Sequence, residues 1–203
     1  MPALKRCAFG VSLVLACLVV AGCGPMLPGP GLGSSTETPT GTPFALPGGV
    51  TVTGDITGDM FGDHADETWG NGPGWVDVGF TLANGTTADV TVEFPAGLIF
   101  IARDVTTQHG MTVQVIAVTL AKSTSRTYRL RLFCVNAHRS VATSIDKFDF
   151  GPVTDSKGLV EIIGLLKGKT LDDSSGDTIQ SAVWSVTDRG GLTAADRQAL
   201  RGL

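Results

Sequence analysis

Between positions 50 and 135 the chain is organised as short apolar or alternating apolar and polar segments, which is the pattern of β-strands with a buried face. Strands are predicted at 50–53, 76–82, 88–94, 98–102, 111–120 and 127–135. In the last segment one face would carry Tyr128, Leu130, Leu132 and Cys134, and the opposite face Arg129, Arg131 and Phe133. The Asn84-Gly85 pair is typical of a two-residue hairpin turn, so we expect the strands on either side of it to pair.

The period changes after Phe150, where apolar residues recur at helical spacing. The predicted helices are 159–166, ending near Gly168, then 177–186, and a short last one. Ser174 or Ser175 would cap the second helix, and Thr193 with Asp196 form a capping box for the third. Strands followed by helices indicate a mainly β domain: a β-sandwich-like sheet unit with a small helical C-terminal part.

Residues 1–22 have the composition of a bacterial export signal. Lys5 and Arg6 precede an apolar run that is too short to span a membrane as a helix. The run from Leu18 to Cys23, LVVAGC, resembles the lipobox of bacterial lipoproteins. The resemblance implies cleavage before Cys23, a lipid such as palmitate on Cys23, and a lipid-anchored location at the bacterial cell membrane or outer membrane. A short anchor that stays uncleaved is the alternative.

Composition divides the exported part in two. Residues 23–47 are rich in Pro, Gly, Ser and Thr, so we expect a tether, and residues 48–203 have the length of one β-rich domain with C-terminal helices. Loss of the signal leaves 13 basic and 19 acidic residues, a net charge of −6. That charge argues against a nucleic-acid partner. The expected partners are the membrane, through the lipid on Cys23, and a protein or glycan ligand at the cell surface.

Cysteine usage draws attention to Cys134. Cys7 and Cys17 fall in the signal and Cys23 in the lipobox, which leaves Cys134 as the free thiol of the exported domain. One interpretation is a buried structural residue, because free cysteine is among the most buried residue types. The others are pairing between molecules and a reactive thiol.

Two segments of the chain suggest chemistry for that thiol. Residues 132–135, LFCV, contain an aromatic-Cys-aliphatic motif, and residues 178–184, TIQSAVW, contain an aliphatic-Gln-x-Ala-aliphatic-Trp motif. Together they resemble the thioester domains of bacterial surface adhesins. The resemblance implies that the sulfur of Cys134 joins the side-chain carbonyl of Gln180 with loss of ammonia, giving an electrophile that acylates an amine or hydroxyl on a target. Alternatively, Gln180 and Trp184 only cap and pack one helix, because residues four apart share a face.

An acidic, Gly-rich loop is a weaker candidate, for calcium. Its members are Asp55, Asp59, Asp63, His64, Asp66 and Glu67. Oxygen-rich loops bind calcium, but the spacing fits no EF-hand, so we expect a solvated acidic loop and no metal. Trp69 and Trp75 follow this loop and would either stack on sugar rings or fold back as a lid on the sheet, which we favour.

A thiol hydrolase is a further alternative, with Cys134 as nucleophile, His138 as base and Asn136 as orienting group. It requires the chain to bend after Val135, since four residues of extended strand separate two side chains by roughly 13 Å. No nucleophile elbow, phosphate loop or paired metal-ligand motif is present in the sequence, and no cofactor is expected. The expected function is therefore non-enzymatic binding or structure at the cell envelope, with the Cys134–Gln180 thioester adhesin as the alternative.

Overall fold

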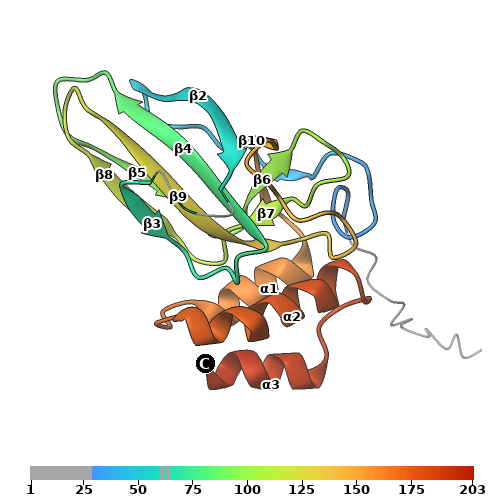
Figure 1. Cartoon of the computed structure of the whole chain (residues 1–203). Helices are drawn as coiled ribbons and strands as arrows, with labels where there is room; N and C mark the ends of the chain where they lie inside the picture. The colour runs from blue at the N-terminus through green and yellow to red at the C-terminus, as the bar shows by residue number, and fades with distance from the viewer. Residues whose placement is uncertain (1–28, 60–61, 63–64) are drawn as a thin grey trace, which may run out of the picture.

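The structure, a computed structural model, describes residues 29–59, 62 and 65–203 (Figure 1). The predicted export signal and Cys23 lie outside these residues. None of the helices it describes is long and apolar enough to cross a membrane.

The described part of the chain is mainly β, as predicted, with three α-helices after the last strand. The strands are β1 (Gly41–Thr42), β2 (Val50–Gly58), β3 (Glu67–Trp69), β4 (Val76–Asn84), β5 (Val90–Phe94), β6 (Leu98–Ala102), β7 (Gly110–Met111), β8 (Ile116–Leu120), β9 (Ser125–Cys134) and β10 (Lys147–Thr154). The helices are α1 (Lys157–Leu166), a 3-10 turn η1 (Asp173–Ser175), α2 (Gly176–Thr187) and α3 (Ala194–Gly202).

The main sheet closes on itself. Its strand order is β1-β10-β2-β4-β9-β7-β6, and β10 also pairs with β6. The short β3 runs parallel to β9, and β5 with β8 forms a separate antiparallel ribbon. The helices gather at one end of this sheet unit (Figure 1). The closed sheet with its added ribbon is compatible with the sandwich-like unit that the alternation predicts.

Two apolar cores follow from the two faces of β9. Tyr128, Leu130, Leu132 and Cys134 belong to a core inside the sheet, which also holds a cluster of phenylalanine rings. Phe133 and Val135 point the other way, into a second core shared with the helices. The predicted division of β9 into two faces is thus confirmed, and Cys134 lies on the inner one.

The predicted hairpin at Asn84-Gly85 is wrong. β4 pairs with β2 and β9, whereas β5 pairs with β8 in the other sheet. Asn84 is buried, and its side-chain amide donates to the carbonyl oxygens of Ala88, Leu120 and Ala121. The Asn84-Gly85 pair therefore starts a connection between sheets. The segment 111–120 is also split between β7 and β8, and β10 was not predicted.

The helices agree with the sequence pattern apart from one cap. Gly168 follows α1 with a φ of 76°, a conformation that glycine adopts readily, and the capping box of Thr193 and Asp196 starts α3. Before α2, the Asp172 carboxylate accepts the Ser175 amide, whereas the Ser175 side chain caps nothing. The cap is thus the aspartate, because η1 adds a turn ahead of the predicted start.

The described part of the predicted tether is packed on the domain. Residues 29–46, called the strap below, contribute Leu32, which is buried in the helical core. Further along, β1 pairs with β10, and the Phe44 ring packs against those of Phe94 and Phe150. Apolar side chains and strand pairing therefore both hold this segment on the domain.

Candidate functional site

The structure brings Cys134 and Gln180 into contact. Cys134 is the last residue of β9, and the pairing of β9 with β4 ends two residues earlier, at Leu132 and Val76. Gln180 of α2 continues that pairing with its side chain. The Cys134 amide donates to Gln180 Oε1 at 2.8 Å, and Gln180 Nε2 donates to the Cys134 carbonyl at 2.8 Å. Both residues are buried, Cys134 completely and Gln180 to within 2%.

One stripe of α2 faces the chain segment that follows Cys134. Gln180 and Trp184 are four residues apart and so share a face of α2, and the C-cap residue Asp188 follows four residues later. Gln180 meets Cys134, Trp184 packs against the inner core, and Asp188 Oδ2 accepts the Ala137 amide at 3.4 Å. The helix thus lies along residues 134–138, which is why the two motifs meet.

The Cys134 thiol lies in an apolar setting. Burial raises its pKa to about 11, while the Asn136 amide, which donates to Sγ at 3.3 Å, lowers it to a smaller extent. The Trp184 indole lies near enough to lower the same pKa, yet its N–H is buried without a hydrogen-bond partner among the described residues. We therefore place this indole beside the thiol but outside hydrogen-bond geometry. With such a pKa, the thiolate is a fraction on the order of 10⁻⁴ at pH 7.

Asn136 ties the strap to the site. Its Nδ2 donates to the carbonyl oxygens of Gly31 and Gly33, at 3.0 and 2.9 Å, and its Oδ1 accepts the His109 amide. The Gly33 amide donates to the Val135 carbonyl at 2.8 Å. Sequence reasoning missed this role, because it depends on a segment more than 100 residues away whose composition indicates a free spacer.

The geometry does not favour the thiol hydrolase. His138 is half-exposed, and its Nδ1 lies 3.5 Å from Asp188 Oδ1. The Asn136 side chain, the candidate orienting group, is engaged with the strap and His109. Cys134 is instead paired with Gln180, so the structure assembles the Cys-Gln pair and not the Cys-His pair.

The acidic loop is held by ion pairs and a backbone hydrogen bond where the structure describes it. Asp63 and His64 lie outside the described residues. Asp55 pairs with Arg103 and Lys147, Asp59 with Arg129, and Glu67 with Arg126. The Asp66 carboxylate accepts the Thr127 amide. Within the described ranges no group of side chains is arranged to hold a metal ion. We therefore assign this loop a structural part in holding the sheet edges.

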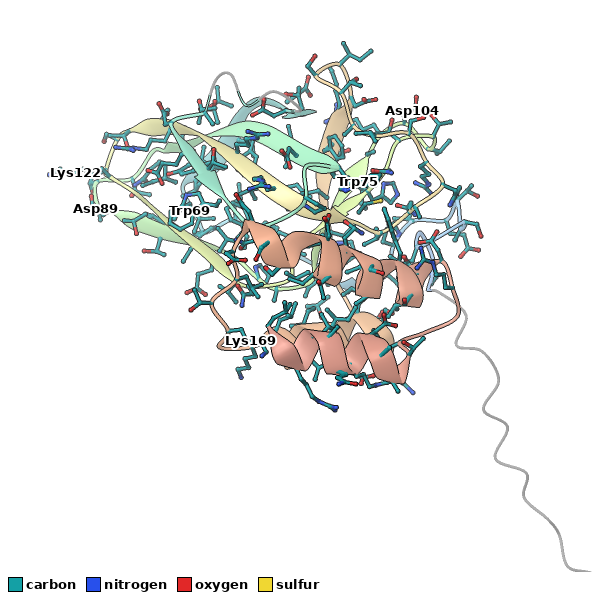
Figure 2. All side chains as sticks on the ribbon, turned by 60° about the horizontal axis from the view of Figure 1, so that its bottom comes forward. Trp69, Trp75, Asp89, Asp104, Lys122 and Lys169 are labelled. Atoms are coloured by element: carbon teal, nitrogen blue, oxygen red, sulfur yellow. The ribbon has the colours of Figure 1, made fainter. Side chains whose placement is uncertain are left out.

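Trp69 and Trp75 are both 40% exposed but make different contacts. Trp69 lies in β3, and its indole N–H donates to Glu67 at 3.1 Å. Trp75 stands edge-on to Trp184, with ring centroids 5.0 Å apart and an interplanar angle of 86°. Figure 2 shows Trp75 near the helices and Trp69 apart from it along the sheet. Trp75 thus folds back toward the site, on the helix and not on the sheet.

Comparison with models of known protein families, with curated proteins and with solved structures finds no match.

Proposed function

We propose that this chain is a lipid-anchored protein of the bacterial envelope whose domain forms a thioester between Cys134 and Gln180 and uses it to attach covalently to a nucleophile on another surface. The observation that supports the thioester is the buried contact of the Gln180 carboxamide with Cys134 through two hydrogen bonds of 2.8 Å. Export and lipidation rest on the lipobox resemblance ending at Cys23.

The chemistry of formation fits these contacts. Sγ of Cys134 attacks Cδ of Gln180, an S–C bond forms, the C–Nε2 bond breaks, and ammonia leaves with the thiol proton. In the tetrahedral intermediate the negative charge develops on Oε1, which already accepts the Cys134 amide. A donor aimed at a developing oxyanion stabilises the transition state. Burial of the pair excludes water, which would otherwise hydrolyse the product.

Attachment to a partner then breaks the S–C bond of the thioester. A primary amine attacks Cδ of Gln180, a C–N bond forms, the S–C bond breaks, and the amine proton passes to the Cys134 sulfur. The result is an amide between Gln180 and the partner, with a free thiol on Cys134. Because the domain is consumed in one event, this is covalent binding and not enzymatic turnover.

A non-covalent binding or structural domain is the second candidate. The same two hydrogen bonds extend the pairing of β9 and fix α2 to the sheet, and a thiol with a pKa of about 11 is a poor nucleophile at neutral pH. In this case Cys134 and Gln180 only hold the helices on the sheet.

The intact mass of the mature chain separates the two candidates. The chain should begin at residue 23 with Cys23→Ala, because a start at Gly48 removes the strap. We expect a mass lower by one ammonia than the sequence requires, and the full mass in Cys134→Ala and in Gln180→Ala. Methylamine should add once and release a thiol that then reacts with iodoacetamide.

Ser181→Ala is the matched control, since Ser181 is an exposed neighbour of Gln180 on α2. It should keep the mass deficit and the methylamine reaction. A full mass in the parent chain would reject the thioester and leave the non-covalent module.

A further inference from the structure

The Cys134–Gln180 pair must be reached from outside if it is to react, and aromatic rings lie on the outer side of it. Trp184 is half-buried and packs on the core that contains Cys134. Trp75 packs edge-on against Trp184 and is 40% exposed. From the surface inward the order is therefore Trp75, Trp184 and the Cys134 thiol.

The loop that carries Trp75 is fixed at its start. The Asn71 side chain donates to the Leu171 carbonyl at 3.1 Å, and the Gly72 amide donates to the Arg131 carbonyl at 3.2 Å. Gly72 also lies so close to the β9 backbone that a side chain there would collide with the Leu132 carbonyl. This half of the loop is therefore immobilised against β9 and the approach to α2.

Trp75 itself lies between a fixed strand and an open turn. Val76, the next residue, is fully buried and begins the pairing of β4 with β9. Gly74, the preceding residue, has a φ of 84° and open space around the position of a side chain. The turn before Trp75 is therefore open, whereas β4 and the first half of the loop are fixed.

We propose that Trp75 is the gate of the Cys134–Gln180 site: packed on Trp184 it closes the path to the buried pair, and when it turns outward it admits a slender nucleophile and still hinders a bulky one. The proposal rests on the proposed function for the nature of the nucleophile. The gate itself controls access of reagents to Cys134, so it can be tested by the reaction of the Cys134 thiol whether or not the thioester forms.

The test uses the mature chain with Cys23→Ala in the Gln180→Ala background, where Cys134 stays a free thiol. Its alkylation is followed by intact mass with two probes, iodoacetamide and a bulky fluorescein maleimide. The interaction free energy of an edge-on aromatic pair stabilises the closed position of Trp75. Its loss should therefore raise the population of molecules with the gate open about two- to tenfold. We expect Trp75→Ala to accelerate iodoacetamide by this factor and the maleimide by more.

Trp69→Ala is the matched control, because Trp69 has the same exposure but lies in β3, where its indole N–H donates to Glu67. It should change neither rate. Trp75→Phe keeps a ring on Trp184 and should accelerate the maleimide less than Trp75→Ala does, which also tests the proposal if the alanine variant folds poorly.

Two results would overturn the gate. One is a Trp75→Ala rate no faster than that of Trp69→Ala. The other is equal acceleration of both probes, which would mean general loosening of the domain. Failure of the proposed function would be seen separately, as a full mass of the chain with Gln180 intact alongside an unchanged effect of Trp75→Ala on alkylation.

Discussion

His109 shows how one buried side chain sets a pH dependence for the whole domain. It is 4% exposed, and its Nδ1 accepts the Ala102 amide at 3.1 Å. Nε2 lies 3.0 Å from the Arg139 guanidinium, so both ring nitrogens face N–H donors, which disfavours a protonated ring with an N–H on each nitrogen. Burial, followed by the charge of Arg139, lowers the pKa of His109 from 6.5 to about 4. The folded protein therefore holds this ring neutral where the unfolded chain would protonate it.

The sign of the effect follows from linkage. A lowered pKa in the folded state adds stability that is present above pH 6.5 and is lost as the pH falls toward 4. We expect the free energy of unfolding to fall by about 2 kcal/mol between pH 7 and pH 5 from this group, measured by urea denaturation. His109→Gln should remove that part of the slope. His138→Gln, at a half-exposed histidine, should keep it, and an equal slope in both variants would contradict the assignment.

At the scale of elements, the period of apolar residues predicts strand faces and helices, but it does not predict which strands pair. The alternation of side chains along β9 predicts its two faces, because successive side chains of a strand point to opposite sides. The helical spacing of apolar residues predicts α2 in the same way. Pairing partners depend on contacts far apart in the chain, so the Asn84-Gly85 pair predicts a hairpin that the fold does not contain.

The residues of the candidate site also differ in whether a local pattern identifies them. The resemblance to thioester domains names Cys134 and Gln180 as a pair, and the structure places the two in contact. Trp75 and Asn136 have no such signal. Their roles depend on which ring or carbonyl the fold brings beside them, which local pattern does not contain.

Asn84 allows a test of how the β5–β8 ribbon is held to β4. Its buried amide bridges the connection between β4 and the β5–β8 ribbon through three carbonyls. Asn84→Ala should destabilise the domain by about 2–3 kcal/mol in urea denaturation, because the loss leaves buried carbonyls unpaired. Thr91→Ala, at an exposed threonine pair of the same ribbon, should cost under about 0.5 kcal/mol. Similar losses would mean that Asn84 does not hold the ribbon.

For the whole molecule, the strap connects the N-terminal side of the chain to the site. Leu32 is buried in the helical core, and Asn136 binds the strap carbonyls two residues after Cys134. If Cys23 carries the lipid, the strap is the first part of the domain beyond the anchor. Hydrogen bonds of Asn136 therefore join the surroundings of Cys134 to the strap, so release of the strap should change access to the thiol.

Leu32→Ala tests this continuity. Removing a buried leucine costs 2–5 kcal/mol in a core that stays closed, but a surface segment can detach instead, so we expect local release of residues 29–36. Hydrogen exchange of that segment should rise at least about tenfold, while β4 keeps its protection. Leu46→Ala, at the far end of the strap, should leave residues 29–36 protected. The alkylation of Cys134 is compared in the Gln180→Ala background, where it stays a free thiol. Because the released strap no longer holds Asn136, Cys134 should alkylate faster in Leu32→Ala than in Leu46→Ala. Equal alkylation rates would show that the strap and the thiol are independent.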